Sequence, residues 1–232
     1  MADQPLSPAA EVVPTPAATV VPLRDVQFGL EVLLLRRNSR GAFGGMWVFP
    51  GGQVDDGDRA TDGNEVDSAR RAAVREAKEE AGLDLDGSNL VALSFWIPPP
   101  EAPRRFATWF FLAPAASSGS VEVDKSEIRE HRWITPVAAM TSHKAGEIEL
   151  APPTFTTLWW LAQHRSVAVA MEAAGSRPPE RFQTHVATGS GQGLLATLWE
   201  GDAGYDDCDF DRPGPRRRLV MDPTGWRVEI AQ

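Results

Sequence analysis

Residues 75–83 (REAKEEAGL) are the segment from which the fold of this chain can be predicted. Glu76, Glu79 and Glu80 are spaced i, i+3 and i+4, so on a helix they share one face with Cβ atoms about 5–6 Å apart. Lys78 points to another side of that helix and does not neutralise them. Mg²⁺ prefers carboxylate oxygens, so the spacing is compatible with a metal site and equally with its ordinary alternative, a solvated face with i,i+4 ion pairs. The segments upstream of the helix favour the metal site.

The residues around this segment predict the helix that carries it. Residues 68–81 contain no Gly or Pro and are rich in Ala, Arg and Glu, which are good helix formers. Asp67 or Ser68 can cap the N-terminus, and Gly82 suits the left-handed position beyond the last turn. Small side chains at near-helical spacing would let the helix dock closely on a sheet; these are Ala69, Ala72, Ala73, Ala77 and Ala81.

The segment before the helix predicts a strand, a loop, a second strand and a tight turn. Residues 32–35 form a short apolar run typical of a buried strand, and residues 36–45 are polar and rich in glycine, as in a loop. Residues 46–49 then lead into the Pro-Gly-Gly turn at 50–52. Two glycines allow the backbone to approach a ligand closely, so this order would bring a backbone carbonyl beside the carboxylates.

In this order the segments resemble the Nudix hydrolases. The box of that family runs Gly, five residues, Glu, seven residues, Arg-Glu, apolar, any residue, Glu-Glu, any residue, Gly, apolar. Gly52 matches its first position and the segment quoted above its second half. Counting from Gly52 places Asp58 in the Glu position, whereas counting back from Arg75 places Asp67 there, so the box contains an insertion of nine residues at 59–67. We predict that Asp67 pairs with Arg75.

The resemblance implies a fold and a metal-dependent chemistry. It implies an α/β protein of the Nudix fold, with a mixed β-sheet between α-helices. It also implies one to three Mg²⁺ or Mn²⁺ ions, whose ligands would be Glu76, Glu79, Glu80 and a backbone carbonyl at Gly51 or Gly52. Such ions lower the pKa of bound water and offset the charge that builds at phosphorus. The box residues assigned to catalysis by the resemblance are Arg75, Glu76 and Glu79, and it leaves open which glutamate is the base.

Candidate phosphate ligands lie downstream of the box. Two predicted strands, 90–97 and 106–112, flank a proline-rich loop that ends in Arg104 and Arg105. Paired arginines can grip a phosphate bidentately. The alternative is edge-strand charge that blocks aggregation.

Aromatic and acidic residues supply further candidates. Trp96 and Trp109 can stack on a purine, with core packing as the alternative. An acidic stretch, a strand with Trp and a Pro-initiated helix commonly follow the Nudix box at this distance, which makes Glu127 and Glu130 candidates for an extra metal ligand or base. Ordinary strand-edge charge is the alternative for both.

Other motifs resemble the Nudix branches that cleave coenzyme A (CoA). Leu33-Leu34, Arg36-Arg37 and the Phe-Pro-Gly-Gly at 49–52 resemble the motif of one branch, which makes Arg37 a candidate substrate ligand. The Leu-Ala-Pro-Pro-Thr element at 150–154, the Arg-Arg-Phe at 104–106 and the inserted box resemble the nudix-19-like branch. The best-known activity there is CoA diphosphatase, which releases 3′,5′-ADP and phosphopantetheine.

The sequence leaves three functions open. The first is hydrolysis of CoA or acyl-CoA to 3′,5′-ADP and (acyl-)phosphopantetheine. The second is a Nudix pyrophosphatase acting on ADP-ribose, NADH, a dinucleotide or a damaged nucleotide. The third is a non-catalytic Nudix-fold ligand sensor, against which the intact Arg75, Glu76, Glu79 and Glu80 argue.

Composition narrows the class of protein. The net charge of −9 argues against a nucleic-acid partner, which needs phosphate neutralisation, and a small-molecule nucleotide is the expected partner. The chain contains no apolar run of about 18 residues, so we expect no membrane span. Nor do we expect a secretory signal. Cys208 is the one cysteine, so no internal disulfide can form and a cytoplasmic location is expected.

The chain divides into three expected parts. Residues 1–14 are a disordered tail rich in Ala and Pro, and residues 15–170 form the Nudix domain. Residues 171–232 form a small antiparallel β extension packed on the core, where short apolar runs alternate with Gly, Asp and Pro turns. This extension could act as a substrate lid or as the surface of a homodimer.

Overall fold

The computed structural model describes residues 13–38, 44–115, 121–123, 127–190 and 193–231. The predicted tail therefore lies outside the described residues except for Val13 and Pro14, as does part of the predicted loop at 36–45. Within the described residues, no helix is both long and apolar enough to cross a membrane.

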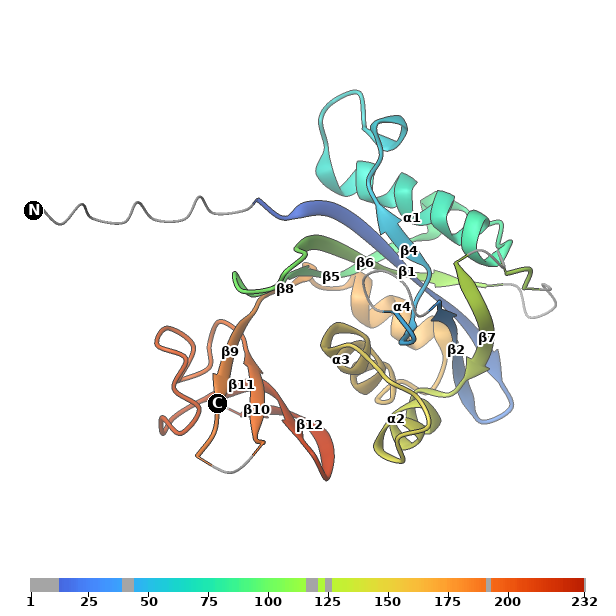
Figure 1. The fold of residues 1–232 in the computed structure, drawn as a ribbon. Coiled ribbons are helices and arrows are strands. Elements are labelled where there is room, and N and C mark those ends of the chain that lie inside the picture. The colour runs from blue at the N-terminus through green and yellow to red at the C-terminus, as the bar shows by residue number, and fades with distance from the viewer. Residues whose placement is uncertain (1–12, 39–43, 116–120, 124–126, 191–192, 232) are drawn as a thin grey trace, which may run out of the picture.

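The main sheet has eight strands in the described part of the chain (Figure 1). Its path runs β3-β2-β1-β6-β5-β8, with β4 paired to β1 and β7 paired to β2. The pairs β1–β6 and β5–β8 are parallel and the others are antiparallel, so the sheet is mixed, as predicted. The strands are β1 Thr15–Val26, β2 Gly29–Arg37, β3 Trp47–Val48, β4 Gly51–Gln53, β5 Val91–Ile97, β6 Phe106–Pro114, β7 Ile128–Ile134 and β8 Glu180–Gln183.

Helices cover both faces of this sheet (Figure 1). Helix α1 packs on one face, and the other three helices pack on the opposite face. The period-2 alternation of β6 separates the two cores: Phe111 and Ala113 face α1, whereas Phe110 and Leu112 face the other helices. The helices are α1 Glu65–Ala81, α2 Pro136–Lys144, α3 Pro152–Leu161 and α4 Val167–Gly175, with 3₁₀ turns η1 Asp56–Asp58 and η2 Gly87–Asn89.

Helix α1 begins earlier than the sequence predicted. It starts at Glu65, and its cap is Asn64, whose side chain accepts hydrogen bonds from two backbone N–H groups at 3.0 and 3.2 Å. The predicted caps, Asp67 and Ser68, lie inside the helix, because the inserted segment supplies an extra first turn as well as a loop. The C-terminal prediction is confirmed, since Gly82 has a φ of 67°.

The small-residue stripe of α1 is fully buried, as predicted. Five alanines face β1, β2 and β6, and they allow the helix backbone to lie close to the sheet. They are Ala69, Ala72, Ala73, Ala77 and Ala81. The opposite faces of the helix therefore separate naturally into a docking side and a side that carries glutamates.

A second, antiparallel sheet follows the main one, as predicted (Figure 1). Its order is β12-β11-β10-β9. The first strand of the predicted extension, β8, joins the main sheet beside β5, whereas β9 belongs to the second sheet. Thr184 forms the junction and donates its N–H to the Ile97 carbonyl at 2.9 Å. The strands are β9 His185–Thr188, β10 Leu195–Leu198, β11 Arg216–Asp222 and β12 Gly225–Ala231.

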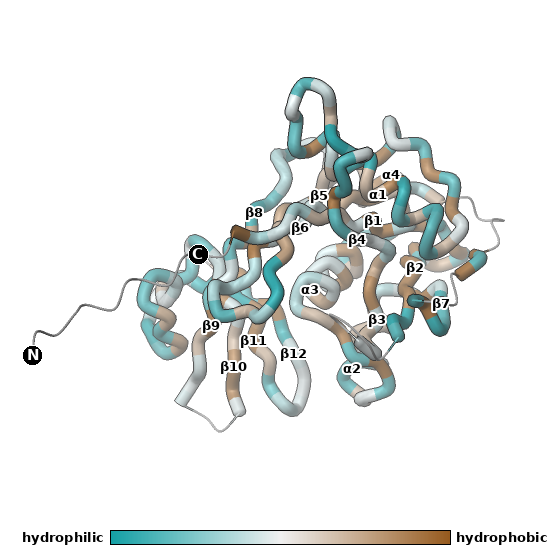
Figure 2. The backbone as a smooth tube through the Cα atoms, turned by 45° about the horizontal axis from the view of Figure 1, so that its top comes forward, coloured by the Kyte–Doolittle hydropathy of each residue, from teal (hydrophilic) through white to brown (hydrophobic). Residues whose placement is uncertain are grey.

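Each face of the second sheet has its own packing partner. One face carries Leu219, Trp226 and Val228 onto the core of the main domain, where the Trp226 ring lies 5.4 Å from the Phe155 ring. The other face carries a small core with Val220. Figure 2 shows hydrophobic residues along β10 and a largely hydrophilic connection between β10 and β11. The second sheet is thus fixed to the main domain by apolar contacts.

A buried ion pair holds the connection between β10 and β11. Arg218 is 1% exposed and donates to both carboxylate oxygens of Asp202, at 2.7 and 2.5 Å. Burial acts to raise the pKa of Asp202, but hydrogen bonds from Arg218 and from two backbone N–H groups hold that pKa below its usual value. Arg218 also donates to the Phe210 carbonyl at 2.7 Å. One guanidinium on β11 therefore holds two points of the segment between β10 and β11.

We expect Arg218→Met to lower the free energy of unfolding by about 3–5 kcal/mol, because it leaves a buried carboxylate without its partner. Thermal and urea unfolding would measure the loss. Arg216→Met is the matched control, since Arg216 lies two residues away on the same strand and outside this pair. Equal stability of the two variants would contradict the role assigned to Arg218.

Candidate active site

Arg75 is the centre of the hydrogen-bond network on the acidic helix. Its Nε and Nη2 donate to the Asp58 carboxylate, at 3.2 and 2.9 Å. Its Nη1 donates to Glu76 at 2.8 Å and to Glu79 at 3.0 Å, and Nη2 also donates to the Gln53 carbonyl at 3.0 Å. The hydrogen bond with Asp58 is the main cause that raises the pKa of Arg75 far above its usual range. The guanidinium therefore stays charged and fixes two glutamates.

The predicted pairing of Arg75 with Asp67 is wrong. Asp67 lies in the first turns of α1, more than two turns before Arg75, and its ion pair is with Arg70 at 3.9 Å. Asp58 takes the position because η1 places it against the helix, where it is buried. The count forward from Gly52 already pointed to Asp58, so the insertion follows the acid instead of preceding it.

The Gly-Gly turn lies directly against the acidic helix, as predicted. The Gly51 N–H donates to Glu80 Oε2 at 2.9 Å. A Cβ at Gly52 would lie 2.2 Å from Glu76 Oε1, far inside van der Waals contact. A side chain at this position would displace the Glu76 carboxylate, and the backbone of the Gly51-Gly52 turn lies beside two of the three glutamates.

Arg37 connects the acidic helix to the strand at the edge of the site. Its Nη1 lies 3.4 Å from Glu80 Oε1, and its Nη2 lies 2.7 Å from Glu127 Oε2. The sequence predicted Arg37 as a substrate ligand, whereas the structure uses its guanidinium to bring Glu127 to the site. Glu130 pairs with two other arginines instead and is not among the residues that line the cleft.

Burial perturbs two of the three glutamates. It raises the pKa of Glu80 to about 7, against the opposing effects of the Gly51 N–H and of Arg37. Burial also raises the pKa of Glu76, with hydrogen bonding from Arg75 acting in the opposite direction. Both carboxylates therefore hold protons more tightly than free glutamate, because the loss of hydration on burial outweighs the stabilisation by the neighbouring arginines.

These residues line one end of a wide cleft with a volume of about 1840 Å³. From the acidic helix the cleft continues past the β5–β6 loop and the start of α3 to the second sheet. Arg104 lines it and makes no ion pair with the described residues. Arg105, predicted as its partner in binding phosphate, is instead buried, with Nη2 3.5 Å from the Pro98 carbonyl. It contributes to the loop and not to the cleft.

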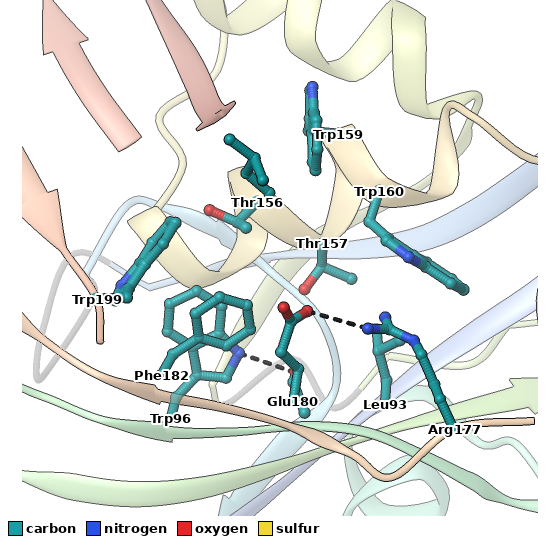
Figure 3. A pocket seen from close by; sticks show the side chains of 12 residues that line it. Leu93, Trp96, Thr156, Thr157, Trp159, Trp160, Arg177, Glu180, Phe182 and Trp199 are labelled. Carbon is teal, nitrogen blue, oxygen red and sulfur yellow. Dashed lines mark hydrogen bonds and ion pairs between the residues drawn. The ribbon is translucent and has the colours of Figure 1, made fainter. Parts of the chain in front are cut away.

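The two tryptophans predicted to stack on a purine have other roles. Trp96 reaches the cleft but is 4% exposed, and its ring stacks on Phe182 at 4.0 Å (Figure 3). Trp109 lies on the opposite face of β6, packed against the core beneath α1 and against Phe95 at 4.6 Å. Purine stacking is therefore wrong for Trp109, and core packing accounts for Trp96. The alternation of β6 places Thr108 and Phe110 in the cleft and Trp109 outside it.

The sequence and the fold match known proteins. The family model for the NUDIX domain matches residues 13–154. The chain therefore belongs to the NUDIX domain family, and it is an enzyme of the Nudix hydrolase type.

Individual relatives have the same class of fold. The chain is 28% identical to the Caenorhabditis elegans protein named "Putative nudix hydrolase 7", over 83% of this chain and 77% of that protein. It resembles the crystal structure of a NUDIX hydrolase from Alicyclobacillus acidocaldarius with a TM-score of 0.64 at 24% identity, covering 73% of this chain and 100% of that one. It also resembles the NUDIX domain of Shewanella oneidensis NrtR, solved with ADP ribose, with a TM-score of 0.50 at 18% identity, covering 68% and 92%. The two structures support the fold alone.

The side chains fit a divalent cation in their chemistry but are not gathered around one point. Nudix hydrolases use divalent metal ions. Within the described residues, no three His, Cys, Asp or Glu side chains converge as a metal site, because Arg75 holds Glu76 and Glu79 while Gly51 and Arg37 hold Glu80. The donors are all oxygens, and two of the carboxylates have raised pKa values. A hard cation would stabilise the ionised form of these carboxylates against the cost of burial.

We expect Asp58→Asn to lower kcat/KM for diphosphate hydrolysis about 10- to 100-fold, because a charged hydrogen bond contributes about 1.5–3 kcal/mol. The neutral amide would hold Arg75 weakly and let Glu76 and Glu79 shift. Asp67→Asn is the control and should leave the rate unchanged. A larger loss of kcat/KM in the Asp67→Asn variant than in the Asp58→Asn variant would contradict the pairing of Arg75 with Asp58.

We expect the affinity for Mn²⁺ or Mg²⁺ to rise with pH across the pKa of Glu80. Below about 7 the carboxyl is protonated and cannot bind a cation, so the affinity should increase about tenfold between pH 6 and pH 8 and then level off. Calorimetric titration of the metal-depleted protein would measure it. Glu80→Gln should weaken binding and flatten the profile, and a flat profile in the unmodified protein would contradict the assignment.

Proposed function

We propose that this chain hydrolyses the diphosphate bond of a nucleoside diphosphate linked to another moiety. The substrate is CoA or an acyl-CoA, and the products are 3′,5′-ADP and (acyl-)phosphopantetheine. The observation that carries this proposal is the cleft that contains Glu76, Glu79 and Glu80 at one end, the uncharged residues of the second sheet at the other end, and Arg104, which has no ion pair among the described residues. CoA carries the same three kinds of group: a diphosphate, a phosphorylated nucleoside on one side of it and a long uncharged arm on the other.

The charges of the cleft support a substrate with a phosphate beyond the diphosphate. Arg37, Arg75 and Arg129 line the cleft and all have acceptors within the protein. Arg104 has none among the described residues, so its five N–H donors are available. A planar guanidinium binds phosphate bidentately. Arg104 is therefore the side chain we assign to the additional phosphate.

The acidic helix provides the ligands for the reaction. Mg²⁺ or Mn²⁺ would be held by Glu76, Glu79, Glu80 and the Gly52 carbonyl, and it would lower the pKa of bound water and neutralise charge on the diphosphate. Arg75 positions Glu76 and Glu79 from one side of the helix. Gly52 keeps the backbone close because it has no Cβ.

Glu127 is the candidate that can accept the proton of the attacking water. Its side chain is 59% exposed, lines the cleft and is oriented by Arg37 at 2.7 Å. Water would attack one phosphorus as Glu127 takes its proton, and the bond from that phosphorus to the bridging oxygen would break. The bridging oxygen leaves on the other phosphate, which gives two phosphate monoesters. A base within hydrogen-bond reach contributes about 10²–10⁴-fold to such a step.

We expect CoA to release 3′,5′-ADP in the presence of Mg²⁺ or Mn²⁺. A panel of CoA, acetyl-CoA, ADP-ribose, NADH and diadenosine polyphosphates, analysed by chromatography, would measure the relative kcat/KM values. Arg104→Met should raise KM for CoA about 10-fold or more with little effect on ADP-ribose, which lacks the extra phosphate, because a charged hydrogen bond contributes about 1.5–3 kcal/mol.

Glu79→Gln serves as the control enzyme and should lose at least about 10²-fold in rate, like other losses of charge stabilisation. Turnover of ADP-ribose without turnover of CoA would overturn the substrate assignment while leaving the enzyme class in place. Tight nucleotide binding without hydrolysis under any metal would favour a ligand sensor.

A further inference from the structure

The second sheet is wider than the surface on which it packs. Residues that pair across antiparallel strands share a face, so Val186, Thr197 and Leu219 lie in one row. Leu219, at the β11 end of the row, is buried against the main core. Val186 and Thr197, at the β9 and β10 end, line the cleft instead. The same face of the second sheet therefore packs on the main domain at its β11 end and lines the cleft at its β9 and β10 end.

We name Val186, Thr197 and Met221 the second-sheet wall. All three line the same cleft as the acidic cluster of α1. Val186 is 37% exposed, which is unusual for a large apolar residue on a packed face. The Thr197 Oγ is buried with no hydrogen-bond partner in the described part of the chain. The wall thus combines open apolar surface with a hydroxyl whose hydrogen-bonding capacity is unused.

The surroundings of the wall have little charge. The β5–β6 loop opposite contributes Pro98, Pro99 and Pro103 to the cleft, and the remaining neighbours include Thr154 and Thr184. The position of the wall relative to this loop is fixed by the hydrogen bond from the Thr184 N–H to the Ile97 carbonyl. Arg104 is the charged side chain that this loop adds to the cleft. Away from Arg104, a charged moiety would lose its hydration without gaining a partner, whereas an uncharged chain would bury apolar surface.

We propose that the second-sheet wall binds the slender, uncharged arm that the nucleoside diphosphate substrate carries beyond its second phosphate. This inference rests on the proposed function, in which that arm is an extended chain with amide groups. Val186 and Met221 contact its methylene groups, and an amide of the arm supplies the missing partner of Thr197. The C-terminal sheet is then the part of the molecule that distinguishes a long substrate from a compact one.

Site-specific alkylation tests this inference without relying on turnover. Cys208 is the one cysteine of the chain and is exposed, so Cys208→Ser gives a background without thiols. Val186→Cys then places a thiol on the wall, and Thr188→Cys places a matched thiol on the same exposed strand face, outside the cleft lining. Both proteins also carry Glu79→Gln to slow hydrolysis. N-ethylmaleimide labelling is followed by mass spectrometry with Mg²⁺ and either S-methyl coenzyme A or ADP.

We expect S-methyl coenzyme A at ten times its Kd to slow labelling of the Val186→Cys thiol about tenfold. ADP, which has the nucleotide and diphosphate without the arm, should leave that rate unchanged. Neither compound should affect labelling of the Thr188→Cys thiol. These three results together support the assignment of the arm to the wall.

Two kinds of failure can be distinguished. If the unmodified enzyme cleaves CoA but S-methyl coenzyme A does not protect the Val186→Cys thiol, this inference is wrong and the proposed function stands. If the enzyme cleaves other diphosphates and not CoA, the substrate assignment is wrong, and so is the assignment of the CoA arm to the second-sheet wall. Protection that depends on protein concentration and not on ligand would show a second copy of the chain on the wall, which also overturns the inference.

Discussion

The site depends on one guanidinium. Arg75 must bind Asp58 firmly enough to hold Glu76 and Glu79 in place, and it does so with the Nε and Nη2 edge on the aspartate and Nη1 on the two glutamates. Lysine could not replace it, because a single ammonium cannot present two separate hydrogen-bonding edges. The short 3₁₀ turn that carries Asp58 thus helps to decide where the acidic side chains of α1 point.

Close backbone packing and electrostatics are coupled at the Gly51-Gly52 turn. The missing Cβ of Gly52 lets the backbone of β4 lie against Glu76, and burial raises the pKa of the neighbouring Glu80 to about 7 although the Gly51 N–H acts to lower it. The alanine stripe on the opposite side of α1 also contributes, because small side chains let the helix pack close to the sheet. A carboxylate that is difficult to ionise without a counter-charge is well suited to a reversibly bound cation.

The second sheet adds length to a cleft that the Nudix domain alone would leave open. Its docked end is apolar and its connection is tied by Arg218 and Asp202, so the overhanging end is held rigidly. Rigidity matters here, because a preformed wall costs a ligand less ordering entropy than a mobile lid would.

The sequence by itself determined the acidic helix, its glycine end, the buried alanine stripe, the Gly-Gly turn and the strand-rich C-terminal extension, because each depends on local spacing. The sequence could not decide whether Asp58 or Asp67 pairs with Arg75. Because of the insertion, counting from Gly52 and counting back from Arg75 give different residues, and only the folded 3₁₀ turn selects Asp58. Tertiary structure also reassigned Arg105 and Trp109, because the face of a strand on which a side chain lies depends on register. It alone placed Val186 and Thr197 on the same cleft as a helix about a hundred residues earlier, since distant segments come together only when the sheets pack.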